Sequence, residues 1–465
     1  MTLDQLAASS GYPDLSYHNW LKALAERVSA KHVLEVGSYL GSTAVAILGA
    51  ANKPSITLLD DLQLSDRGVL AANVPGDRVR QIVYGKDLVQ MPKILKAFQD
   101  IDFVHLDADH RAYPLLGELI CVHLFSGAKT IVVHDASDKY VKHGVAEFKR
   151  WYGSHWDIQE VKEVYSEAYL ITRKTNSREQ SNATTNLIVP PGIGDIAWVW
   201  QRLPEDFGDV TVQVCGGGPP RAVPFVDLLP GVIKAELTTL RFAWLRIYRI
   251  PYYADPRLFK GTSFPIEVNG FLEGDFKLGD VFPSVPVRYS LPLKIPQAMT
   301  QQAIQVASKY KNIVGLYSSS GPNNNWGHND PRKWCESAVA IHRELKPGAI
   351  AIIGADFDRP YTDVICRCLK ERRIPHIPVI GQHIGYVTEL IRRMKALLAF
   401  PSGIGVIGSL VGTPTVMGMP CHLPKLQYKW VNPAAIQSKK FIHRPIDNLK
   451  QMTDTFLYEL NMDRS

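Results

Sequence analysis

The stretch His32–Thr43, HVLEVGSYLGST, decides the fold of the N-terminal half of this chain. A short apolar run ends in Glu35, and a turn that holds Gly37 and Gly41 then opens into the helical pattern TAVAILGAA. Glycines let a backbone approach a ligand closely, and an acidic residue just before the turn suits a cationic or hydroxyl-bearing cofactor better than a phosphate. A strand, a glycine turn and a helix in this order predict a nucleoside-binding α/β unit.

Polar residues around this turn extend the prediction. Ser38 and Ser42 offer hydrogen-bond donors where the helix begins. About 20 residues further on, the run SITLL ends in Asp60 and Asp61, which are placed to bind ribose hydroxyls as in dinucleotide-binding folds.

Carboxylate and imidazole side chains follow two later strands. The segments DFVHLDADH (residues 102–110) and KTIVVHD (residues 129–135) each indicate a buried strand with acidic residues and histidines at its end. The carboxyl ends of parallel strands share one edge of a doubly wound sheet, so these residues should converge with the glycine turn on one crevice. For any one of them, a solvated strand end or a core histidine is the alternative. The segments EVKEV and AYLITR, with a two-residue turn at Ser166-Glu167, predict a terminal antiparallel hairpin.

Residues 16 to about 174 resemble a class I S-adenosylmethionine-dependent methyltransferase, within the small O-methyltransferase group that includes macrocin O-methyltransferase and cephalosporin hydroxylase-like proteins. The glycine turn after Glu35 matches the cofactor loop, and LDADH matches the group's D-x-x-H element. The resemblance implies S-adenosylmethionine as cofactor, Asp107 as a ligand of a divalent metal and His110 as general base on a sugar hydroxyl. The family's second metal pair, Glu-Asp, falls on His134 and Asp135. The family's ion is Mg²⁺, whereas an imidazole ligand suits softer metals.

The implied chemistry is coherent by itself. A sugar hydroxyl is a poor nucleophile, so taking a methyl group from a sulfonium needs deprotonation or metal activation, together with in-line positioning.

Composition and length bound the whole chain. At 465 residues it is too long for one such domain and predicts two or three. No apolar run approaches 18 residues, and the N-terminus lacks the basic start and apolar core of a signal peptide. We therefore expect no membrane span, a cytoplasmic location and reduced thiols for the six cysteines.

Charge is unevenly shared between the two halves. Residues 1–180 hold 20 Lys and Arg against 22 Asp and Glu, a net of −2, which leaves +9 for the remainder of a chain with net charge +7. The second half should therefore bind anionic ligands, such as nucleotide-sugar phosphates, an acidic glycan or nucleic acid, although solvated helix surface is the alternative. No nucleic-acid-binding motif supports the last of these ligands.

The organisation of the chain follows from these patterns. We expect a methyltransferase domain over residues 1–174, a polar linker over 175–186, and two α/β subdomains over 187–296 and 297–465. The fold class is α/β: a Rossmann-like sheet with a terminal hairpin, followed by two further α/β subdomains.

Two glycine-rich motifs of the second half are GIGDIA (residues 192–197) and SGIGVIGSLVGTPTV (residues 402–416). With them, residues 187 to about 445 are similar to the heptosyltransferase-like family of GT-B glycosyltransferases, which implies a GT-B pair of Rossmann-like domains. GIGDIA matches the family's G-x-G-D element, which implies Asp195 as base on the acceptor hydroxyl. SGIGVIGSLVGTPTV matches the element that cradles the donor diphosphate, where backbone amides at a helix N-terminus hold phosphate. The expected residues for the nucleotide-sugar donor are Ser318, Ser319, Ser402, Gly403 and Gly405.

Three positions depart from that family. Pro401 replaces an Asp, Val406 replaces a His, and Asn325 stands where many members carry Lys. The leading hypothesis is a bifunctional transferase that O-methylates a sugar hydroxyl and transfers a glycosyl group to a glycan, glycolipid or glycosylated small molecule. Two alternatives remain: a methyltransferase whose GT-B half only binds sugar or nucleotide, and a modifier of hydroxymethylated nucleic-acid bases.

Overall fold

The computed structural model describes residues 2–61, 67–108, 110–174, 185–200, 209–216, 222–241, 291–319, 330–400, 402–419, 441–445 and 449–462. The chain divides into two compact units. The described residues of the first unit lie mainly in Met1–Ile188, and those of the second in Val189–Thr239 and in 291–462. The predicted linker 175–186 falls almost wholly outside the described residues, and the domain division at 296 stays a prediction.

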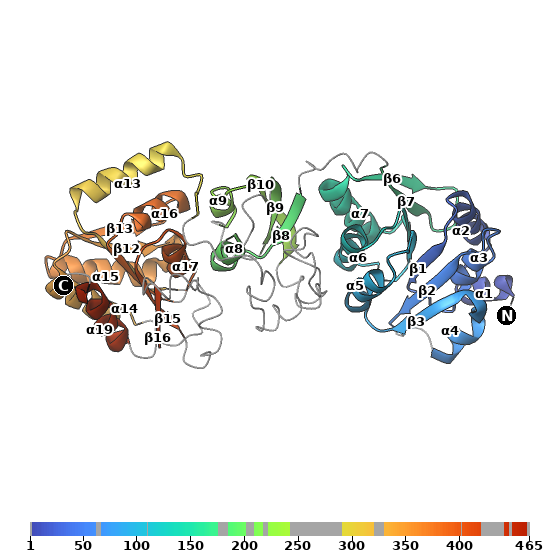
Figure 1. Ribbon diagram of the computed structural model, residues 1–465, viewed down its shortest axis with the longest axis horizontal. Coiled ribbons are helices and arrows are strands. Elements are labelled where there is room, and N and C mark those ends of the chain that lie inside the picture. Colours follow the sequence, from blue (N-terminus) through green and yellow to red (C-terminus); the bar gives the residue numbers. More distant parts are fainter. Residues whose placement is uncertain are drawn as a thin grey trace. The chain divides into compact units, whose positions relative to one another are not determined.

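The first unit is built on a sheet with the strand order β3-β2-β1-β4-β5-β7-β6 (Figure 1). The strands β1 to β5 pair in parallel, whereas β7 runs antiparallel to both β5 and β6. This order confirms the predicted Rossmann-like sheet with a terminal antiparallel hairpin. The strands are β1 (His32–Val36), β2 (Ser55–Asp60), β3 (Val79–Tyr84), β4 (Phe103–Leu106), β5 (Thr130–His134), β6 (Trp156–Val161) and β7 (Ala168–Arg173).

Helices cover both faces of this sheet, with α5, α6 and α7 on one face and α2 and α3 on the other (Figure 1). Every residue of β1, β4 and β5 is buried, because a parallel strand covered on both faces has no solvent side. The helices are α1 (Leu3–Ser9), α2 (Ser16–Arg27), α3 (Ser42–Leu48), α4 (Arg67–Asn73), the short η1 (Gly76–Arg78), α5 (Asp87–Ala97), α6 (Ala112–Phe125) and α7 (Lys139–Tyr152).

The terminal hairpin differs from its prediction in the length of its connection. β6 ends at Val161, so the connection spans residues 162–167 and is not a two-residue turn. Ser166 and Glu167 both adopt positive φ, at 60° and 58°. Before them, the backbone N–H of Tyr165 donates to Ser16 Oγ at 3.3 Å. This hydrogen bond ties the connection to the first residue of α2.

Two further sheets lie mainly in the second unit. The smaller has the order β10-β9-β8 and carries two short helices. Its elements are β8 (Thr185–Val189), α8 (Ile193–Trp200), β9 (Val210–Gly216), α9 (Ala222–Val226) and β10 (Val232–Arg241).

The larger sheet of the second unit is parallel throughout, in the order β13-β12-β11-β14-β15-β16. This is the doubly wound order of dinucleotide-binding folds, which confirms the α/β class of this half. Its strands are β11 (Val314–Tyr317), β12 (Ile350–Gly354), β13 (His376–Ile380), β14 (Ala396–Ala399), β15 (Thr415–Met419) and β16 (Phe441–Pro445). Its helices are α13 (Gln297–Lys309), α14 (Pro331–Leu345), η3 (Asp356–Asp358), α15 (Arg359–Glu371), α16 (Ile384–Arg392), α17 (Gly403–Leu410) and α19 (Leu449–Met462).

Cysteine pairing corrects one expectation. Cys335 on α14 and Cys368 on α15 form a disulfide, so the expectation of reduced thiols is wrong for this pair. Cys121, Cys215 and Cys366 are free thiols. Among the described residues, no helix has both the length and the apolar character needed to cross a bilayer.

Candidate active site

The turn after β1 meets the end of β4 at the point where the strand order of the first sheet reverses. Ligands of open α/β sheets bind at such switch points, outside the carboxyl ends of the strands. The backbone N–H of Asp107 donates to Val36 O at 2.9 Å, and Gly37 N–H donates to Leu59 O at 2.9 Å. The glycine turn and the first acidic residue after β4 are therefore direct neighbours.

The two glycines of this turn serve the packing of the protein itself. Gly37 has φ +84°, and a Cβ added to it would lie 2.5 Å from the carbonyl carbon of Asp107. Gly41 has φ +85° as the residue that precedes α3, and its added Cβ would lie 2.5 Å from Val74 Cγ2. Each glycine therefore makes room for protein atoms, and the expectation that this turn also binds a cofactor stays a prediction.

Glu35 is fully buried beside the turn. Its Oε1 accepts a hydrogen bond from the Thr43 hydroxyl and lies 3.3 Å from His105 Nδ1. Its Oε2 is buried and has no hydrogen-bond partner among the described residues. A buried carboxylate oxygen without a donor suits a cationic group of a bound ligand.

Other predicted cofactor residues lie at the same edge. Asp60 ends β2, is 6% exposed and accepts a hydrogen bond at 2.7 Å from the backbone N–H of Tyr39 within the glycine turn. Asp61 follows it and is exposed. Ser38 and Ser42 are buried, and the Ser38 hydroxyl has no hydrogen-bond partner in the described part of the chain.

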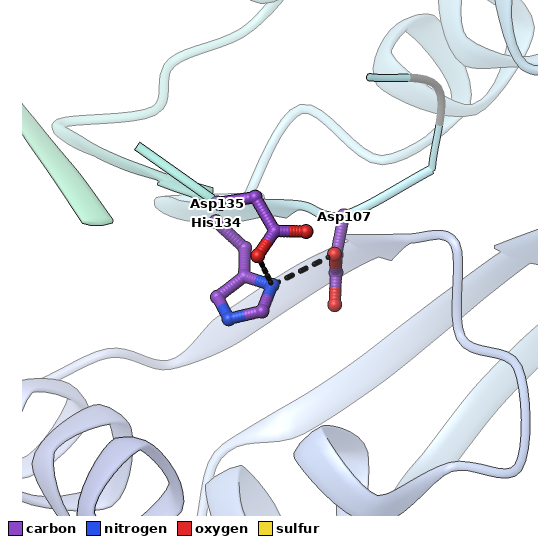
Figure 2. Close-up of side chains that lie close together, drawn as sticks. All are labelled: Asp107, His134 and Asp135. Carbon is purple, nitrogen blue, oxygen red and sulfur yellow. Dashed lines mark hydrogen bonds and ion pairs between the residues drawn. The ribbon is translucent and has the colours of Figure 1, made fainter. Parts of the chain in front are cut away.

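Asp107, His134 and Asp135 form the centre of the site (Figure 2). His134 Nδ1 lies 3.0 Å from Asp107 Oδ1 and 3.5 Å from Asp135 Oδ1. One candidate ligand atom from each of the three residues lies within 4.8 Å of the others. Asp135 adopts φ +55°, a strained value for a residue with a side chain, which turns its carboxylate back toward His134.

His110 completes the cluster from its exposed side. Its Nε2 lies 3.4 Å from Asp107 Oδ1 and 3.2 Å from Asp135 Oδ2, and its side chain is 44% exposed. All four residues that the sequence predicted for metal and base therefore meet at one place. The order along the chain is Asp107, His110, His134 and Asp135, from the ends of two neighbouring strands.

Opposite charges within the cluster lower the pKa of its carboxyl group Asp107 and raise the pKa values of its two imidazoles. Burial acts to raise the pKa of Asp107, but the charge of His134 and the hydrogen bonds from His110 and His134 bring it well below its ordinary value. Burial lowers the pKa of His134, and the charge and hydrogen bond of Asp107 raise it above the ordinary value. The hydrogen bond to Asp107 also raises the pKa of His110. The two carboxylates thus favour positive charge at this point.

The donor set fits a divalent metal ion. Two carboxylates converge on one imidazole nitrogen, and a cation between them would take the place of the proton. One nitrogen and several oxygens suit Mn²⁺ and other first-row ions better than Mg²⁺, which prefers oxygen ligands alone.

Aromatic residues from the first two helical segments cover this cluster, and sequence reasoning missed them. The Tyr12 hydroxyl donates to Asp107 Oδ2 at 3.3 Å, and the Tyr17 hydroxyl lies 2.7 Å from His105 Nε2. The Tyr17 ring lies 4.3 Å from the His134 ring, centroid to centroid. Burial raises the pKa of Tyr12 far above its usual value, so its hydroxyl is a donor. Tyr12 precedes Asp107 by 95 positions in the chain, and no local pattern pointed to these residues.

The second unit has a switch point of its own, between β11 and β14. Phe400 N–H donates to Tyr317 O at 2.7 Å, so the two strand ends lie side by side. Ser318 and Ser319 follow β11 and are buried. The Ser319 hydroxyl donates to the Asp358 carboxylate.

The glycine-rich element after β14 opens α17. Ser402 Oγ accepts a hydrogen bond from Gly405 N–H at 3.3 Å and so caps the helix. A Cβ added to Gly403 would lie 3.0 Å from the backbone N of Gly194, in the first turn of α8. Val406 is 3% exposed and faces Gly194 across the same contact.

Three positions named from the sequence of this half fall outside the described residues or side chains. Asp195 occupies the third position of α8, inside the helix that begins at Ile193, and its side chain lies outside the described residues. Pro401 and Asn325 also lie outside them.

This chain is similar to several proteins of solved structure. No protein-family profile and no curated protein matches this chain. An O-methyltransferase from Bacillus cereus in complex with SAH matches over 37% of this chain and 89% of its own, with 16% sequence identity and a TM-score of 0.30. The ADP-heptose LPS heptosyltransferase II of E. coli matches over 59% of this chain and 99% of its own, with 12% identity and a TM-score of 0.38.

A third solved structure is CalS11, a TDP-rhamnose 3′-O-methyltransferase of calicheamicin biosynthesis. It matches over 35% of this chain and 79% of its own, with 16% identity and a TM-score of 0.28. O-methyltransferases and a heptosyltransferase are the two kinds of protein that the sequence resembles. With identities below 25% and TM-scores below 0.5, we take the function from the chain's own residues.

Proposed function

We propose that the first unit is a metal-assisted O-methyltransferase that uses S-adenosylmethionine and acts on a sugar hydroxyl. The observation that carries this proposal is the meeting of Asp107, His134 and Asp135 beside the Gly37 turn, with His110 on the exposed side. The carboxyl ends of β1, β2, β4 and β5 thereby supply, along one sheet edge, groups for a nucleoside cofactor and groups for acceptor activation.

The cofactor would contribute the methyl group from its sulfonium. Glu35 Oε2, buried and lacking a donor, would accept a hydrogen bond from the cofactor's ammonium group. Asp60 at the end of β2 would accept from ribose hydroxyls, in the geometry that dinucleotide-binding folds use.

A divalent ion at Asp107, His134 and Asp135 would lower the pKa of the acceptor hydroxyl. Without the ion, the hydrogen bond to Asp107 and the charges of Asp107 and Asp135 raise the pKa of His110. The positive charge of an ion would oppose that shift and favour the neutral imidazole, which could accept the proton of the hydroxyl at Nε2.

Calorimetry tests the cofactor and the metal separately on the full chain. We expect S-adenosylmethionine and Mn²⁺ each to bind at one site, and Asp107→Asn to weaken Mn²⁺ while leaving the cofactor bound. A wild-type protein that binds neither contradicts the proposal. Methyl transfer to a panel of nucleotide sugars and free glycosides, read by mass spectrometry, then identifies the acceptor class.

We propose further that the second unit binds a nucleotide sugar and transfers its glycosyl group. Support comes from the switch point between β11 and β14, where Ser318, Ser319 and the N-terminus of α17 adjoin, since α/β sheets bind ligands at such points and helix N-termini bind phosphate. A second candidate is a unit that binds but does not transfer. Val406 favours it, because an apolar side chain there offers no hydrogen bond to a donor.

Hydrolysis of nucleotide sugars separates these two candidates. Transfer predicts slow release of the nucleoside diphosphate from a cognate sugar nucleotide, and Asp195→Asn should abolish it. A protein that binds the sugar nucleotide without releasing the nucleoside diphosphate, and whose binding is unchanged by Asp195→Asn, would support the second candidate. Failure to bind any sugar nucleotide would refute both.

A further inference from the structure

Tyr12 stands at the edge of the metal cluster although it belongs to the N-terminal helical segment. Its backbone N–H donates to Ala7 O at 3.0 Å, and Gly11 before it has φ +87° with no atom within 4 Å of an added Cβ. This turn after α1 directs the Tyr12 side chain toward the sheet edge, where its hydroxyl donates to Asp107 Oδ2 at 3.3 Å. The contact joins the beginning of the chain to a residue 95 positions later.

The two oxygens of Asp107 have separate partners. Oδ2 accepts from Tyr12, whereas Oδ1 faces His134 Nδ1 at 3.0 Å and His110 Nε2 at 3.4 Å. The hydroxyl of Tyr12 therefore holds the carboxylate in the rotamer that directs Oδ1 into the cluster.

The Tyr12 ring is held from several sides. It lies 4.5 Å from the His18 ring and 5.6 Å from the His134 ring, and Tyr165 packs edge-on at 5.8 Å. The side chain thus touches two of the three candidate metal ligands, one through its hydroxyl and one through its ring.

We propose that Tyr12 is a positioning residue of the metal centre, and that binding of the divalent ion is linked to the docking of α1 on the first unit. This inference rests on the proposed metal-assisted function. A hydrogen bond from outside the coordination sphere orients a ligand carboxylate and raises metal affinity. By reciprocity, an ion that binds better with Tyr12 in place stabilises the docked position of the segment that carries Tyr12.

Calorimetric titration of the full chain with Mn²⁺ tests the first part. Tyr12→Phe keeps the ring and removes the hydroxyl, so we expect Mn²⁺ affinity to fall about 10- to 100-fold. The affinity for S-adenosylmethionine measured without metal should stay within about twofold, because Tyr12 lies outside the predicted cofactor residues. Tyr165→Phe is the matched control, since it removes a hydroxyl from the neighbouring ring and should leave Mn²⁺ affinity unchanged.

Hydrogen exchange of the unmodified protein tests the second part. Saturating Mn²⁺ should slow exchange of the amides in Leu3–Ser9, and Tyr12→Phe should remove that protection. Two results would overturn the inference while the wild-type chain still binds Mn²⁺: an unchanged Mn²⁺ affinity in Tyr12→Phe, or no added protection of α1 by Mn²⁺. Either result leaves the proposed function standing. A wild-type chain that binds no Mn²⁺ overturns both.

Discussion

Of the glycine-to-alanine substitutions in the turn after β1, Gly37→Ala should destabilise the first unit most. The residue has φ +84°, a conformation that costs a side chain about 1–2 kcal/mol. The added Cβ would also lie 2.5 Å from the carbonyl carbon of Asp107 and 2.6 Å from Ala108 Cα. Both atoms belong to the backbone after β4, so no side-chain rotation can relieve the overlap.

The magnitude follows from the sum of two costs. Overpacking against backbone adds about 1–3 kcal/mol to the cost of the left-handed conformation, which predicts a total destabilisation of about 2–5 kcal/mol. Gly11→Ala is the matched control, because Gly11 has nearly the same φ, +87°, and nothing within 4 Å of its added Cβ. It should therefore cost only about 1–2 kcal/mol.

Hydrogen exchange of the amides of β1 and β4 in urea, on the full chain, reports the stability of the first unit alone. We expect Gly37→Ala to lower the free energy of opening by about 1–3 kcal/mol more than Gly11→Ala does. Equal effects of the two substitutions would refute the close approach of the glycine turn to β4. Gly37→Ala should also weaken Mn²⁺ binding, since any shift of the backbone at Asp107 moves a ligand.

Four further outcomes are expected. Asp107→Asn should weaken Mn²⁺ at least about 100-fold in calorimetry, and activity insensitive both to this change and to chelators would exclude a metal role. His110→Ala should slow methyl transfer about 10²–10⁴-fold with cofactor affinity unchanged, whereas a small effect would mean that the metal alone activates the acceptor. Burial lowers the pKa of His18 to about 4. Because the unfolded chain binds that proton near pH 6.5, stability should fall by up to about 3 kcal/mol between pH 6.5 and 4, and His18→Phe should remove that part of the slope in urea unfolding. Reduction of the bond between Cys335 and Cys368 should add the mass of two hydrogens and cost about 3–4 kcal/mol for a loop of 33 residues, and an unchanged mass would contradict the pairing.

Sequence reasoning reached the elements and the ligand types of the site because those depend on local patterns. The apolar runs that end in Glu35, Asp60, Asp107 and His134 each form a strand of the first sheet. Parallel strands place their carboxyl ends together, so residues spread over 100 positions of the sequence could be assigned to one edge from the sequence alone.

The same reasoning failed where the outcome depended on contacts from outside the local pattern. The hairpin connection is longer than expected and contacts α2 through the hydrogen bond between Tyr165 and Ser16. Cys335 pairs with Cys368 because α14 packs against α15.

The chain's own periodicity and turn residues determined that a doubly wound sheet forms and which acidic and histidine side chains stand at its edge, since both follow from interactions between near neighbours in sequence. Only the packed structure decided that Gly37 is small because Asp107 lies against it, and that Tyr12 reaches the metal cluster. Those contacts arise when helices and strands from distant segments are pressed together to bury apolar surface. Their partners are therefore selected by three-dimensional packing, which no local pattern encodes.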